Sequence, residues 1–163
     1  MNLEVRRFRI VIAVAALLVS AMAPDLACAQ ESHMHAHQGA AVAQLQLDQG
    51  RRWPTDASLR AGMAGIRKAF DADHPAIHAG KETDAQYDAL AAAVEAQVNE
   101  IVAHCKLPPA ADANLHYVVA DLLQGVNLMR GGDPARSRHD GAALVHGALL
   151  AYPKYFDDPE WTH

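Results

Sequence analysis

The fold class is decided by one stretch of sequence, residues 83–105, which reads TDAQYDALAAAVEAQVNEIVAHC. Thr83 and Gln86 match the capping box, a pattern in which two side chains pair with backbone N–H groups at the start of a helix. The apolar residues that follow recur every three or four positions, which is the period of an α-helix. They are Tyr87, Leu90, Val94, Val98, Ile101 and Cys105. The stretch therefore predicts an amphipathic helix, which Pro108-Pro109 ends.

Another helix is predicted upstream, starting near Thr55-Asp56, where Asp56 is a typical N-cap. Its apolar residues recur at helical spacing, namely Leu59, Met63, Ile66 and Phe70. We expect it to end before His74-Pro75, because the residue that precedes a proline avoids the helical region. Gly62 and Gly65 interrupt it, which indicates that another helix or a flat ligand approaches closely there.

Two more helical patterns follow downstream. One covers about Asp112 to Arg130 and stops at Gly131-Gly132, and the next opens at Asp133-Pro134 and is bounded by Pro153. No segment alternates with period two, so no sheet is expected. Four such stripes with short connections predict an all-α fold, an antiparallel up-down-up-down four-helix bundle over residues 53–163. The predicted core is Leu59, Met63, Ile66, Phe70, Leu90, Val94, Val98, Ile101, Leu115, Val119, Leu122, Val126, Leu144, Ala148 and Tyr152.

Residues 1–29 have the composition of an export signal. Three arginines precede an apolar run from Ile10 to Ala23, and Ala27-Cys28-Ala29 has the A-x-A form of a cleavage site. We therefore expect a signal peptide and a mature protein that is periplasmic or secreted. Acylation of Cys28, as in a lipoprotein, is the alternative. Cleavage one residue later than expected would place Glu31-Ser32-His33 at the terminus, a square-planar chelate for Cu(II) or Ni(II).

The charge and composition of the chain exclude several classes of partner. The formal net charge is −5, so the chain has no basic footprint for nucleic acid. After the leader, no apolar run approaches the roughly 20 residues of a membrane span. Cys105 is the one cysteine left after cleavage, which excludes a disulfide scaffold. The sequence also allows a homodimer.

Histidine is the chemical anomaly of the chain, with ten residues in 163. Residues 30–52 are predicted to be a flexible arm, disordered to about residue 44, because they are polar, rich in alanine and glutamine, and without a strong period. His33, Met34, His35 and His37 lie on it as H-M-H-A-H. Imidazole is the commonest metal ligand and thioether sulfur is soft, so this motif favours copper in either oxidation state, with zinc also open. A polar arm without a physiological metal is the plainer interpretation.

A second candidate metal site lies at the turn between the second and third predicted helices. Cys105 and its neighbour His104 end one helix, and His116 leaves the next helix at almost the same height. A thiolate with one or two imidazoles is a donor set for zinc or copper. We expect Cys105 to be mostly buried, with His116 as its nearest imidazole. A core thiol without a metal is the alternative.

Four other histidines have no predicted role. His74, His78 and His139 map to the opposite end of the bundle, and His146 lies off the apolar stripe of its helix.

Three stretches carry a resemblance: LQLDQGRRWPTDASLRAGMAGIR at residues 45–67, AIHAG at residues 76–80, and IVAHCKLPPAADANLH at residues 101–116. They resemble a family of small, uncharacterised exported proteins of proteobacteria, whose members often begin with a His-rich arm. The resemblance implies a metal link and little more about function. His104 stands where that family more often has asparagine, which argues against His104 as an essential ligand.

The remaining motifs narrow the function. The chain lacks H-E-x-x-H, G-x-S-x-G and the P-loop, so we expect no enzyme. The overall shape is similar to cytochrome c-prime and the soluble b-type cytochrome, but C-x-x-C-H is missing and a tyrosine and a proline stand where a helix-4 ligand is expected. Haem, with Met63 as its ligand, is therefore an unfavoured alternative. The sequence predicts an exported metal-binding protein, and a structural or partner-binding bundle is the other alternative.

Overall fold

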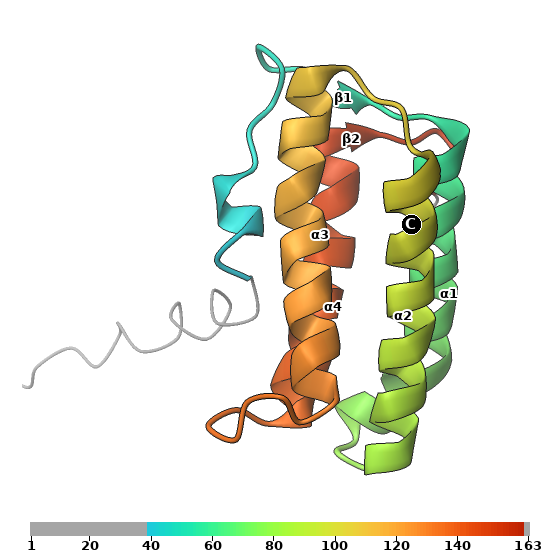
Figure 1. Ribbon diagram of the computed structural model, residues 1–163, viewed down its shortest axis with the longest axis vertical. Helices are drawn as coiled ribbons and strands as arrows, with labels where there is room; N and C mark the ends of the chain where they lie inside the picture. The colour runs from blue at the N-terminus through green and yellow to red at the C-terminus, as the bar shows by residue number, and fades with distance from the viewer. Residues whose placement is uncertain (1–38, 162–163) are drawn as a thin grey trace, which may run out of the picture. The chain divides into compact units, whose positions relative to one another are not determined.

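The computed structural model describes residues 39–161, whose helices lie side by side (Figure 1). Helices make up most of this part of the chain, as the sequence predicts. Its elements in chain order are the short 3₁₀ helix η1 (Val42–Gln44), β1 (Trp53–Pro54), α1 (Ala57–His78), α2 (Asp84–His104), α3 (Pro109–Met129), α4 (Arg138–Tyr155) and β2 (Phe156–Asp157).

The helix starts follow the capping rules, but two ends differ from the sequence prediction. Thr83 and Gln86 form the predicted capping box of α2, and Asp56 caps α1 through a hydrogen bond from the Leu59 N–H at 2.8 Å. The prediction that α1 ends before His74-Pro75 is wrong, because α1 continues to His78. Pro75 lies in the last turn, where it removes one helical hydrogen bond at the exposed surface. Burial of Ile77 beyond it favours the extra turn.

The boundaries of α3 and α4 also differ from expectation. The chain leaves α2 at Cys105, and α3 begins at Pro109, where proline at the first helical position needs no N–H partner. Helix α4 begins after Ser137 rather than at Asp133-Pro134, because Ser137 and Asp140 form a capping box. It also runs past Pro153 to Tyr155.

The core lies between the four helices and matches the predicted set closely. All of the predicted core residues are buried except Val119, which is half-buried against the same cluster. Met63, the residue that a haem would need as its ligand, has no exposed surface. None of the helices within residues 39–161 is both long and apolar enough to cross a bilayer.

Glycine contacts join the helices as two tight pairs. A Cβ on Gly62 would come within 2.3 Å of the Ile101 side chain of α2, so α1 packs closely on α2 as the interrupted stripe indicates. Gly125 of α3 and Gly141 of α4 approach one another equally closely, since a Cβ on Gly141 would lie 2.6 Å from the Gly125 carbonyl oxygen. The seam between α1 and α4 has no glycine contact of this kind, and it contains open grooves.

The segment before α1 is packed rather than free. Residues 39–52 belong to the predicted flexible arm, yet Val42 and Leu45 are buried and η1 lies against α3 and α4 (Figure 1). Asp121 of α3 is also buried, and its carboxylate accepts hydrogen bonds from the N–H groups of Val42 at 2.8 Å and Ala41 at 3.3 Å. The predicted boundary of the arm at residue 52 is therefore too late.

Two short strands and several aromatic rings close one end of the molecule. Trp53 of β1 pairs with Phe156 of β2 in a two-residue parallel ladder, which joins the chain just before α1 to the chain just after α4. Phe156 stacks on buried Tyr152 at 5.4 Å, and Trp161 meets the same tyrosine edge-on at 4.9 Å. The Tyr152 hydroxyl donates to buried Asp158 at 3.1 Å. The expectation of no sheet is thus wrong only for these paired residues.

Candidate functional site

Four histidines gather on the seam between α1 and α4. They line one groove of about 260 Å³, with His74 and His78 on α1 and His139 and His146 on α4. Phe70 and other apolar residues form the rest of its wall. We call this feature the histidine groove.

The helical period explains why these side chains meet. His74 and His78 are four residues apart in the last turns of α1, so both lie on one helix face. His139 and His146 are seven residues apart, which is two turns of α4 and again one face. The arrangement depends on the continuation of α1 through Pro75, because a helix that ended before it would give His78 no fixed direction.

His74 has the central place among the rings. Its centroid lies 5.4 Å from that of His146 and 6.1 Å from that of His78. The ring of Phe70 stacks on His146 at 5.1 Å and 18°. His139 stands at the end of the groove, where its Nδ1 lies 3.4 Å from the Tyr87 hydroxyl.

These distances are close to those of imidazoles that share a metal ion. Two imidazoles on one tetrahedral zinc ion, with Zn–N bonds of about 2.0 Å, have ring centroids roughly 5 Å apart. Within residues 39–161, no three His, Cys, Asp or Glu side chains are arranged to hold a metal as they stand. His74, His78 and His139 are exposed and His146 is half-buried, so the first three side chains can change rotamer without disturbing the core.

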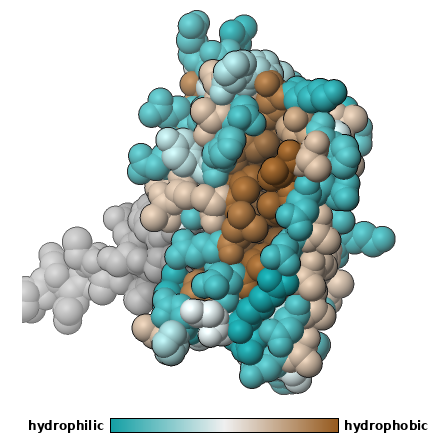
Figure 2. Space-filling model, viewed as in Figure 1, coloured by the Kyte–Doolittle hydropathy of each residue, from teal (hydrophilic) through white to brown (hydrophobic). Residues whose placement is uncertain are grey.

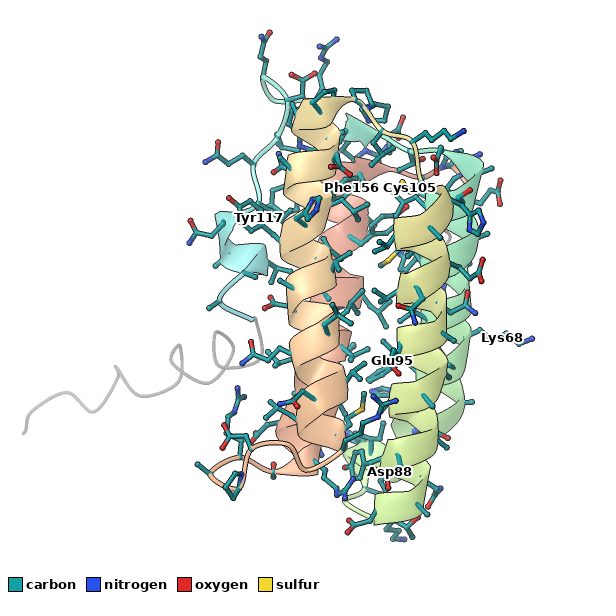
Figure 3. The ribbon with its side chains drawn as sticks, viewed as in Figure 1. Lys68, Asp88, Glu95, Cys105, Tyr117 and Phe156 are labelled. Carbon is teal, nitrogen blue, oxygen red and sulfur yellow. The ribbon has the colours of Figure 1, made fainter. Side chains whose placement is uncertain are left out.

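Cys105 lies in a different environment, at the junction of α2 and the turn that leads to α3 (Figure 3). It is half-buried, and its thiol donates a hydrogen bond to the carboxylate of Asp56. The same carboxylate accepts the backbone N–H of Lys106 at 2.5 Å and caps α1 through Leu59. Asp56 therefore ties the start of α1 to the end of α2, and Cys105 is part of that tie.

The surroundings of Cys105 favour the neutral thiol. Burial raises the pKa of Cys105 to about 11, and the nearby carboxylates of Asp56 and Asp112 add to the shift. For Asp56, burial alone would raise the pKa, but the hydrogen bonds from Leu59, Lys106 and Cys105 outweigh it and lower the pKa below its usual value. A thiol that donates a hydrogen bond to a carboxylate is stabilised in its protonated form, whereas a metal ligand must be the deprotonated thiolate.

The two histidines predicted beside Cys105 lie in separate places. His116 lines a pocket of about 270 Å³ on the α2–α3 face together with Cys105 and Asp112, and its Nδ1 is 2.8 Å from the Asp112 carbonyl oxygen. His104 lines another groove, between α1 and α2, and its Nδ1 lies 3.2 Å from the Glu100 carboxylate. Both side chains are largely exposed, at 73% and 62%. The structure brings Cys105 and His116 to one pocket but turns His104 to another face.

The other predicted ligands, His33, Met34, His35 and His37, lie outside the described residues. The sequence does not predict the histidine groove, because the predicted first helix ends before His74-Pro75. The available signal was the spacing of H-P-A-I-H at residues 74–78, which places two imidazoles one turn apart if the helix continues.

Comparison of the chain with protein-family models, curated proteins and solved structures gives no match.

Proposed function

We propose that this protein binds a zinc or copper ion, Zn(II) or Cu(II), in the histidine groove between α1 and α4. The observation that carries the proposal is that four imidazoles from two helices line one groove, with the rings of His78 and His146 beside that of His74. Imidazole nitrogen is a donor that both ions accept readily.

The donor set of the groove supports divalent ions over soft monovalent copper. The groove offers nitrogen ligands and no sulfur, whereas Cu(I) favours thiolate and thioether. A tetrahedral Zn(II) ion needs four donors, which imidazoles and water can supply together. His74, His78 and His146 are the ligands that the ring distances favour, and His139 is within reach of the same groove.

The proposal also assigns functions to residues 1–29 and to the His-rich arm. We propose that residues 1–29 export the chain to the periplasm or beyond, where the mature protein meets metal ions outside the cytoplasm. The arm motif of His33, Met34, His35 and His37 is proposed as a second binding segment that also accepts copper or zinc. Its support is the sequence motif alone.

We also propose that successive helices run in opposite directions, as in the antiparallel up-down-up-down bundle that the sequence predicts. The short connections 79–83, 105–108 and 130–137 support it, because a helix joined to the next by so few residues must turn back along it.

A titration with a matched histidine control tests the groove. The mature chain with His33, His35 and His37 replaced by alanine is titrated calorimetrically with ZnCl₂ and with a Cu(II) salt. We expect one ion to bind, and His74→Ala/His146→Ala to lower its affinity at least tenfold. His104→Ala removes an exposed histidine outside the groove and should change the affinity less than twofold. Equal affinities in all of these proteins would refute the groove as the site.

A partner-binding bundle is the second candidate function, and one surface favours it. An apolar strip runs along the front face between α2 and α3 (Figure 2). Ile101, Val102, Leu115 and Val119 line the pocket on that face, and Val102 is 69% exposed. Contiguous exposed apolar surface is typical of interaction sites. Val102→Lys, which should abolish self-association or partner binding without affecting metal affinity, separates this candidate from the first.

A further inference from the structure

The seam between α1 and α4 contains a second and larger cavity beside the histidine groove. This cleft has a volume of about 730 Å³, and Phe70 and His146 belong to the walls of both cavities. A volume of this size is in the range of sites that enclose a small organic molecule. The metal-binding proposal makes no use of the cleft.

Aromatic rings and apolar side chains make up much of the wall. Trp161 lines the cleft from the C-terminal segment, Phe70 and His146 line it as a stacked pair, and three apolar residues of α4 complete the lining. Trp161 is held in place by its edge-on contact with Tyr152. An aromatic ring fixed in this way can pack against a flat ligand without losing much conformational entropy.

The charged side chains of the cleft are predominantly basic. Arg67 stands with its guanidinium 4.5 Å from the centroid of the Trp161 ring, and Lys154 lies at the exposed rim. Asp71 is the one acidic residue in the lining. Two permanent cations against one carboxylate favour an anionic ligand.

We propose that the cleft between α1 and α4 binds a small aromatic carboxylate, with its ring against Trp161 and the apolar residues of α4 and its acid group between Arg67 and Lys154. The inference goes beyond metal binding and does not depend on it. It is therefore tested in the presence of EDTA, so that a failure of the metal site leaves the result unaffected.

A pair of probes of equal shape tests the proposal. The mature chain is titrated calorimetrically with 2-naphthoate and with 2-naphthamide, which share one ring system and differ in charge. We expect the carboxylate to bind at least tenfold more tightly than the amide. Trp161→Ala should weaken the binding of both probes at least fivefold, because both lose the stacking partner.

Charge variants then locate the acid group. In Arg67→Gln/Lys154→Gln the preference for the carboxylate should fall to less than twofold, while the affinity for the amide stays within twofold of the wild-type value. Lys154→Gln alone changes an exposed residue and should lower the preference severalfold in a protein that keeps its fold. Lys68→Gln is the matched control, because Lys68 of α1 points away from the bundle (Figure 3) and does not line the cleft.

Three results would overturn the proposal. They are equal binding of the two probes by the wild-type protein, no binding of either probe, and a Lys68→Gln effect as large as that of Lys154→Gln. The last result would mean that general surface charge, rather than this cleft, attracts the carboxylate.

Discussion

Ligand-type side chains have opposite roles in two regions of this molecule. At the junction of α2 and α3, the thiol of Cys105 is half-buried and donates a hydrogen bond to a carboxylate that also caps α1. In the histidine groove, the imidazoles of His74 and His78 are exposed and lie beside other imidazoles. The first region uses a donor to hold the fold together, and the second leaves the imidazoles of His74 and His78 exposed to solvent.

The difference shows that residue type alone does not identify a metal site. A cysteine followed by a nearby histidine in sequence has the composition of a zinc or copper site. The thiol of Cys105, however, keeps its proton and donates it in a hydrogen bond to Asp56, and a metal would have to displace that proton. The histidines of α1 and α4 have no cysteine near them in sequence and become neighbours only when the helices pack. Five predictions test this contrast, from the largest expected effect to the smallest.

Asp56→Ala should lower the free energy of unfolding by about 3 kcal/mol. The change removes an N-cap, usually about 1 kcal/mol, and leaves the N–H groups of Leu59 and Lys106 and the thiol of Cys105 without their acceptor. Urea denaturation followed by circular dichroism measures the loss. Asp71→Ala, at an exposed position of α1, is the control and should change stability by less than about 0.5 kcal/mol.

The contribution of Asp56 to the free energy of unfolding should decrease in acid. The folded pKa of Asp56 lies below its unfolded value, so its stabilisation is present above the unfolded pKa and is lost as the pH falls through the folded pKa. Wild-type protein should therefore approach the stability of Asp56→Ala in acid. A constant difference between the two proteins down to pH 2 would contradict the assigned hydrogen bonds.

The sequence predicted the fold better than the sites, and particular residues explain why. The apolar stripes of α1 to α4 and the Thr83 capping box depend on residues that are close together in the chain. A single sequence is therefore enough to predict them. The end of α1 depends on a tertiary gain, the burial of Ile77, which outweighs the local effect of Pro75. The contact between Cys105 and Asp56 joins residues far apart in the chain, so no spacing rule could indicate it.

Metal binding at the histidine groove should stabilise the folded protein by about 2.7 kcal/mol when free Zn(II) is a hundredfold above its dissociation constant. The ion links α1 to α4 in the folded state, and the unfolded chain holds these histidines far apart. Thermal unfolding with and without ZnCl₂ measures the gain in the background that lacks the arm histidines. The gain should vanish with EDTA and in His74→Ala/His146→Ala; a gain of the same size in that variant would place the ion elsewhere.

Cys105 should react with iodoacetamide about tenfold more slowly at pH 8 than an unperturbed thiol. Burial and the carboxylate of Asp56 raise the folded pKa to about 11, so little thiolate is present. The same shift means that the neutral thiol stabilises the fold below the unfolded pKa near 9 and that this contribution is lost as the pH rises towards 11. Asp56→Asn should accelerate alkylation severalfold, whereas Asp71→Asn should leave it unchanged.

Cys105→Ser should have the smallest effect, a loss of about 0.5 kcal/mol, because a hydroxyl can still donate to Asp56 and is a better donor than a thiol. Cys105→Val keeps the apolar volume but removes the donor, so it should cost about 1 kcal/mol more than the serine variant. A cysteine that acted only as a core hydrophobe would give the reverse order, since valine would fill the site and serine would place a hydroxyl in apolar surroundings. Urea denaturation of the two variants therefore decides whether the hydrogen bond to Asp56 or the apolar packing of Cys105 matters more to the fold.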